Sequence, residues 1–187
     1  MNYRIMIQGT PNPNALKFVL NVPVKSAGNV TYKSAQDCEF NPLAKKIFDV
    51  SPDIKEVYFF DNYITVTQNG NSDWNNIEEL VQKTILDNVA QHNPNFMDVQ
   101  KQTSPQLQAN TDDPELAKIG AILDQTVRPA LQADGGDLQL IELRDNVLKI
   151  NYQGACGSCP SSTMGTLKAI EELLKSEYNP NIKLEAA

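Results

Sequence analysis

A polar stretch near the middle of the chain limits what this sequence can fold into, because it separates two segments with their own hydrophobic patterns. Residues 91–111 are rich in Gln, Asn and Pro and show the period of neither a helix nor a strand. One continuous core is therefore not expected. A chain of 187 residues is long enough for two small domains. We predict domains at residues 1–90 and 112–187, joined by a polar linker over residues 91–111.

The first segment has the pattern of a small α+β domain. Three strand-like runs precede a hairpin, in which V-Y-F-F and Y-I-T-V-T flank a two-residue turn at 61–62. Asn41 followed by Pro42 has the order of a helix N-cap and a first-turn proline. A second helical period begins near Ser72 or Asp73. Helices beside a mostly antiparallel sheet predict an α+β fold.

The second segment predicts another domain of the same class. Asp113 and Pro114 can start a helix, and Pro129 should kink or stop it. A hairpin follows around a turn at 144–146, and N-I-K-L-E near the end can add a short edge strand. The helix after the hairpin carries an apolar stripe that is expected to be core: Met164, Leu167, Ile170 and Leu174. Both domains are thus predicted as small α/β-sandwich-like units.

Charge and hydropathy exclude several classes of partner. The formal net charge is −7, and the acidic groups are scattered without a basic run, so neither nucleic acid nor an anionic membrane is an expected partner. No apolar run approaches a membrane-spanning length. The opening M-N-Y-R-I-M-I-Q resembles neither a signal nor a transit peptide. We expect a cytoplasmic protein, or an organelle-matrix protein that has already been processed.

The segment Gly154–Ser162 carries the most informative chemistry. Cys156 and Cys159 are two residues apart, between a predicted strand and a predicted helix, so both thiols can face one metal centre. Gly154 and Gly157 let the backbone turn and approach closely. The N-terminus of a helix favours the thiolate form. A single C-x-x-C leaves three hypotheses open: a metal or cluster site, thiol–disulfide exchange, and no function.

The number of available ligands favours a shared site. Structural zinc and the common iron–sulfur clusters take four protein ligands, and Cys156 with Cys159 supplies two. Cys38 lies in the other domain and is expected to be a packing cysteine. His92, the only histidine, is expected to be a solvated polar residue. Two copies of the chain would supply four thiolates, a set that suits iron–sulfur or zinc, so a homodimer is predicted.

The loop Ala133–Asp137 contains two glycines but lacks the Lys and Ser/Thr of a phosphate-binding loop. We interpret it as a tight turn with both glycines at unusual backbone angles. Asp134 and Asp137 have neither a nucleophile nor a histidine near them in the sequence. No hydrolase site is predicted, and the protein is not expected to be an enzyme.

Two groups of motifs resemble the NifU-like scaffold proteins known as Nfu. The second domain resembles the family's C-terminal module in V-R-P-A-L-Q-A-D-G-G-D-L-Q-L and in G-A-C-G-S-C-P-S-S-T-M. The first resembles the Nfu N-terminal module in Q-G-T-P-N-P-N-A-L-K-F, in N-P-L-A-K-K-I-F and in the hairpin V-Y-F-F-D-N-Y-I-T-V-T. The resemblance covers nearly the whole chain apart from the linker.

The resemblance implies an iron–sulfur scaffold or carrier. Cys156 and Cys159 would ligate a cluster bridging two subunits, most often [4Fe–4S] in the family, with [2Fe–2S] as the alternative. The implied partners are a second copy of the chain, cluster donors and apo iron–sulfur client proteins. The resemblance assigns no catalytic residue to the N-terminal module. Two rival hypotheses remain: a thiol–disulfide oxidoreductase in which Cys156 attacks and Cys159 resolves, and a structural zinc-bridged dimer.

Overall fold

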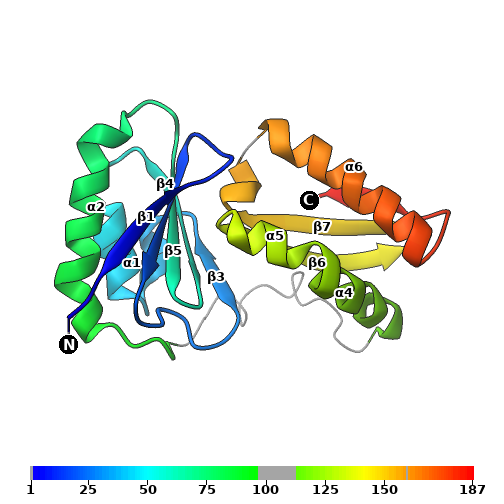
Figure 1. Cartoon of the computed structure of the whole chain (residues 1–187), viewed down its shortest axis with the longest axis horizontal. Coiled ribbons are helices and arrows are strands. Elements are labelled where there is room, and N and C mark those ends of the chain that lie inside the picture. The colour runs from blue at the N-terminus through cyan, green and yellow to red at the C-terminus, as the bar shows by residue number, and fades with distance from the viewer. Residues whose placement is uncertain (1, 97–112, 159) are drawn as a thin grey trace. The chain divides into compact units, whose positions relative to one another are not determined.

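The computed structural model describes residues 2–96, 113–158 and 160–187, with the side chains of 158 and 160–164 excepted. The chain forms two compact units, Met1–Val99 and Gln100–Ala187, called here the N-terminal and C-terminal domains (Figure 1). Within the described ranges, no helix combines the length and the apolar character needed to cross a bilayer.

The N-terminal domain is built on a five-stranded antiparallel sheet with the order β1-β2-β5-β4-β3. The strands are β1 (Ile5–Gly9), β2 (Ala15–Leu20), β3 (Asn29–Tyr32), β4 (Ile54–Phe60) and β5 (Tyr63–Gln68). The helical elements are η1 (Ala35–Cys38), α1 (Pro42–Phe48), α2 (Trp74–Asn88) and η2 (Val89–Gln91). The core joins Phe18 and Ile64 of the sheet to Val81 and Ile85 of α2, which Figure 1 shows alongside the sheet. The predicted α+β domain is confirmed.

Capping residues set the starts of the two N-terminal helices, as predicted. The Asn41 side chain accepts a hydrogen bond from the Ala44 amide at 3.1 Å, and Pro42 is the first residue of α1. Asp73 caps α2 by accepting from the Asn75 amide at 3.0 Å. Each cap satisfies an amide that the first helical turn leaves without a partner.

His92 differs from its predicted solvated state. Its ring stacks on Phe59, and its Nε2 donates to the carbonyl oxygen of Val24 at 2.7 Å. Phe96 is buried beside it, and the Lys25 ammonium donates to the Phe96 carbonyl at 3.2 Å. The polar composition of residues 91–96 did not predict this packing, because Phe96 is the only aromatic residue in that segment. The rest of the predicted linker, residues 97–111, lies outside the described residues.

The C-terminal domain has a three-stranded sheet of order β6-β7-β8. Its elements are α4 (Pro114–Thr126), α5 (Arg128–Ala133), β6 (Gly136–Arg144), β7 (Val147–Gly154), η3 (Ala155–Ser158), α6 (Pro160–Glu177) and β8 (Lys183–Ala186). β6 and β7 form the predicted hairpin, whose turn residues Asp145 and Asn146 both have positive φ. β8 adds the expected edge strand and runs parallel to β7.

One face of this sheet packs against α4 and α6. Leu148, Ile150 and Tyr152 of β7 are buried, as their alternation predicts. Ile170 and Leu174 of α6 are buried in the same core, together with residues of α4 and β6. Leu167 is partly buried, and the side chain of Met164 lies outside the described part of the chain. The apolar stripe of α6, as far as it is described, is therefore core.

Pro129 ends the preceding helix as predicted. α4 stops at Thr126, and α5 begins at Arg128 with Pro129 in its first turn. Proline lacks an amide hydrogen, so a continuous helix through this position would lose a backbone hydrogen bond. The break places Arg128 at the corner between the two helices.

Candidate functional site

Cys156 lies in the short loop between β7 and α6, as the sequence predicts. β7 ends at Gly154, whose φ of +63° favours glycine, and η3 then leads into α6 at Pro160. Cys156 is partly exposed within η3. Cys159 lies outside the described residues, so its pairing with Cys156 stays a prediction from the C-x-x-C spacing.

Gly136 forms one wall of the Cys156 site. An ideal β-carbon on this glycine would lie 2.6 Å from the Cys156 Sγ and 2.7 Å from the Gln153 carbonyl oxygen, distances that real β-carbons do not reach. Gly135, the preceding residue, has a φ of +82°. Only one of the two glycines therefore has the unusual backbone angle that we predicted for both. The other is needed because the cysteine sulfur approaches the backbone.

Gly157 provides a second close approach. An ideal β-carbon there would lie 2.9 Å from the carbonyl oxygen of Tyr152, so a larger residue would push the loop away from β7. The predicted role of Gly157 in a close backbone approach is confirmed. Together, Gly136 and Gly157 allow the Cys156 loop to lie close against the open end of the β6–β7 hairpin.

Tyr152 places an uncharged side chain near Cys156. The side chain is largely buried, and its hydroxyl has no hydrogen-bond partner among the residues that the structure describes. Burial and the nearby Cys156 sulfur raise the pKa of Tyr152 to about 12. The phenol therefore remains un-ionised at neutral pH and adds no charge beside the thiol.

Cys38 is a packing residue of the N-terminal domain, as predicted. It is 1% exposed, and its thiol donates to the Ser34 carbonyl at 3.3 Å. Burial, with a smaller effect of Asp37, raises the pKa of the Cys38 thiol to about 12. A thiol that ionises with such difficulty is a poor metal ligand.

The described residues of this chain do not complete a metal site. Across residues 2–96, 113–158 and 160–187, no group of three or more His, Cys, Asp or Glu side chains is placed to hold a metal ion.

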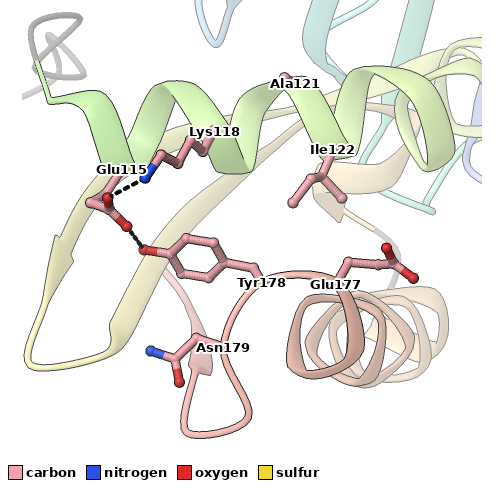
Figure 2. A pocket seen from close by; sticks show the side chains of 7 residues that line it. All are labelled: Glu115, Lys118, Ala121, Ile122, Glu177, Tyr178 and Asn179. Atoms are coloured by element: carbon pink, nitrogen blue, oxygen red, sulfur yellow. Dashed lines mark hydrogen bonds and ion pairs between the residues drawn. The ribbon is translucent and has the colours of Figure 1, made fainter.

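A separate hollow lies between α4 and the end of α6 (Figure 2). Its lining consists of Glu115, Lys118, Ala121, Ile122, Glu177, Tyr178 and Asn179. In Figure 2 the Tyr178 hydroxyl points to Glu115, which also pairs with Lys118 at 2.8 Å. Cys156 precedes the first residue of α6, whereas this hollow is at its last turn, about 27 Å away along an 18-residue helix. The hollow contains neither cysteine nor histidine and is distinct from the thiol site.

The fold and the thiol loop define a two-domain α+β protein with one cysteine loop at the end of a hairpin. Residues 5–92 match the family described as "Scaffold protein Nfu/NifU N terminal". Residues 119–185 match the family described as "NifU-like domain". The chain belongs to the Nfu family of iron–sulfur cluster scaffold proteins.

Two relatives align with nearly the whole chain, across both domains. The chain is 33% identical over 180 residues to the human "NFU1 iron-sulfur cluster scaffold homolog, mitochondrial", with 96% of this chain and 69% of the relative covered. It is 31% identical over 173 residues to "NifU-like protein 4, mitochondrial" of Arabidopsis thaliana, covering 91% of this chain and 61% of that protein. A solution NMR structure of a NifU-like protein from Saccharomyces cerevisiae aligns with 49% of this chain and 85% of its own, with a TM-score of 0.45 and 23% identity.

Proposed function

We propose that this protein carries an iron–sulfur cluster bound by Cys156 and Cys159 and transfers it to apoproteins. The observation that carries the proposal is the position of Cys156. Cys156 is partly exposed at the strand-to-helix junction, and its sulfur lies against a glycine that leaves space for it. A ligand in such a loop can hold a cluster at the surface, where another protein can reach it. The names of the relatives support the scaffold role.

The proposed binding unit is a homodimer. The usual iron–sulfur clusters take four thiolates, and one C-x-x-C motif contributes two. Two chains related by a two-fold axis would each present Cys156 and Cys159 to one cluster. We propose [4Fe–4S] as the cargo, with [2Fe–2S] as the alternative, because both accept four thiolates.

Transfer is proposed to occur by ligand exchange. A client thiol loses its proton and bonds to a cluster iron, while the bond from that iron to Cys156 or Cys159 breaks. The released thiolate takes up a proton, and the oxidation states of iron and sulfide do not change. This is exchange without catalytic turnover, so the proposed protein is a carrier and not an enzyme. The proposed partners are cluster donors and apo iron–sulfur clients.

Thiolate ligands require a reducing environment. We therefore propose that the protein acts in the cytoplasm or in an organelle matrix, and the mitochondrial relatives favour the matrix for proteins of this kind.

Anaerobic reconstitution with iron and sulfide tests the proposal. We expect a brown dimer with one cluster per two chains, measured as iron, acid-labile sulfide, visible absorbance and mass in solution. Cys156→Ser and Cys159→Ser should each abolish the absorbance. Cys38→Ser is the matched control, because this cysteine is buried in the other domain, and it should leave the cluster content unchanged.

Two results would reject the cluster carrier. A colourless monomer that cycles a disulfide between Cys156 and Cys159 would identify an oxidoreductase. A colourless dimer that retains zinc and fails to activate an apo iron–sulfur client would identify a structural zinc site.

A further inference from the structure

The carboxylate of Asp137, one residue after Gly136, is nearly inaccessible to water. Its side chain is 2% exposed, and it accepts hydrogen bonds from three neighbouring groups. The Arg128 Nη1 donates to Oδ1 at 2.7 Å, the Leu138 amide donates to the same oxygen at 2.7 Å, and the Gln132 Nε2 donates to Oδ2 at 3.3 Å. Such donors hold a buried carboxylate in a single orientation.

Arg128 connects this carboxylate to the helical corner. Besides Asp137, its Nη1 donates to the Leu138 carbonyl oxygen at 2.7 Å, and its Nε pairs with Asp124 at 2.6 Å. Asp124 belongs to α4 and is 62% exposed, whereas Arg128 begins α5 and is 23% exposed. One guanidinium therefore fixes the start of β6 to the junction between α4 and α5.

The start of β6 also contacts the Cys156 side chain. Gly136 pairs with Gly154 across the hairpin, and the Ala155 amide donates to the Gly135 carbonyl at 3.2 Å. The sulfur of Cys156 lies against Gly136. Any displacement of Asp137 along the strand direction is therefore transmitted through one peptide unit to the surface that Cys156 contacts.

The ion pair lies on the far side of a change of register in the β6–β7 hairpin. The turn at Asp145 and Asn146 sets the pairing of the nearby residues, but the register shifts between Leu140 and Glu142. Beyond this bulge, the pairing is offset by one residue from the pairing that the turn sets, and Gly136 faces Gly154. The apolar face of the hairpin already disfavours a one-residue slip, and a directional ion pair to a buried carboxylate can add to it by fixing the position of this strand end.

We propose that Arg128 and Asp137 are positioning residues for the cluster loop: the ion pair between the partly exposed Arg128 and the buried Asp137 fixes Gly136 against Cys156 and so sets the direction of the cysteine sulfur. This inference rests on the proposed function, in which Cys156 is a cluster ligand. Neither Arg128 nor Asp137 contacts the cargo in this proposal, and both act through the backbone of Gly135 and Gly136.

The test compares Asp137→Asn with Asp124→Asn in the full-length chain. Both variants remove one carboxylate from the same guanidinium, but only the first affects the β6 end next to Gly136. In the apoprotein, amide hydrogen exchange at Ala155 is measured by NMR, with the Ile150 amide in the middle of β7 as reference. In the loaded protein, visible circular dichroism reports the geometry of the thiolate–iron bonds.

We expect Asp137→Asn to accelerate exchange at Ala155 at least tenfold while Ile150 changes less than twofold, and to alter the visible circular dichroism. Asp124→Asn should change neither signal. The proposal is overturned if the two variants give the same Ala155 exchange and the same spectra. It is also overturned if exchange rises equally at Ala155 and Ile150, because that would show a general loss of stability.

A second variant covers the case in which Asp137→Asn does not fold. Arg128→Lys keeps the positive charge but removes the planar guanidinium, whose Nη1 bonds Asp137 and the Leu138 carbonyl while its Nε pairs with Asp124. The same selective exchange at Ala155 is expected, and its absence overturns the proposal. If the wild-type chain takes up no cluster, the proposed function fails, but the exchange at Ala155 in the apoprotein still decides whether the ion pair positions the loop.

Discussion

The sulfur of Cys156 lies where a side chain on Gly136 would have to be. A β-carbon built on Gly136 would be 2.6 Å from this sulfur, 2.7 Å from the Gln153 carbonyl oxygen and 3.0 Å from the Cys156 amide nitrogen. Two of these three neighbours are backbone atoms, which cannot move aside by a change of rotamer. The residue at position 136 thus limits how closely the thiol loop can approach the hairpin.

Gly136→Ala should displace the Cys156 loop. The methyl group requires the backbone of residues 153–156 to shift, which overpacking data place at a cost of about 1–3 kcal/mol in stability. Because a misplaced ligand binds poorly, we expect a loss of cluster affinity on the order of 10- to 100-fold. Iron and sulfide retained after anaerobic gel filtration would measure it. Full retention by a folded variant would contradict the close approach.

Gly165→Ala makes the same chemical change where space is open. This glycine lies within α6, and apart from its own helix backbone and chain neighbours an added β-carbon would meet no heavy atom of the described residues within 4 Å. Alanine in a helix is favoured over glycine by about 0.5–1 kcal/mol. We expect the unfolding midpoint of the C-terminal domain to rise and the cluster content to stay the same. A fall in stability would show that Gly165 has a role that its open surroundings do not explain.

Local sequence rules were sufficient for most of the fold. Asn41, Pro42 and Asp73 act on residues next to them in the chain, so the helix starts could be predicted without tertiary contacts. Pro129 ended its helix for the same reason. The packing of His92 could not be predicted, because its partners Val24 and Phe59 are distant in the sequence. The parallel pairing of β8 with β7 was missed because it too is non-local.

In the candidate site, too, the local features could be predicted from the sequence and the non-local ones could not. The position of Cys156 between a strand and a helix followed from the sequence pattern around it. The role of Gly136 did not, because it depends on the register of the whole β6–β7 hairpin and on the shift between Leu140 and Glu142. Counting back from the predicted turn at 144–146 would have brought residue 136 near residue 154. That count was the available signal for the contact with Cys156.

Cys38 should be inert and dispensable for the cargo. With the pKa of its thiol raised to about 12, roughly one molecule in ten thousand is ionised at pH 8. We expect Cys38 to escape iodoacetamide in the native chain and to react after denaturation, as measured by peptide mass spectrometry. Cys38→Ala should lower stability by about 0.5–1.5 kcal/mol through the small cavity it leaves, without changing the cluster content. Native labelling of Cys38 would contradict its burial.

His92 should make the stability of the N-terminal domain depend on pH. Burial lowers the pKa of His92 below its ordinary value of 6.5, with Lys25 acting in the same direction and the hydrogen bond to Val24 opposing it. As the pH falls below about 6.5, the unfolded chain binds a proton that the folded chain does not. Stability is therefore complete above this pH and is lost progressively until the folded His92 is itself protonated.

Urea unfolding between pH 7 and 5 measures this effect, with Trp74 as the reporter. Trp74 is the only tryptophan of the chain and lies in α2, so its fluorescence reports the N-terminal domain. His92→Gln is the control, since its amide can still donate to the Val24 carbonyl but does not titrate. The variant should lose the part of the pH dependence that His92 causes, because glutamine does not titrate. An equal pH dependence in both proteins would assign the effect to groups other than His92.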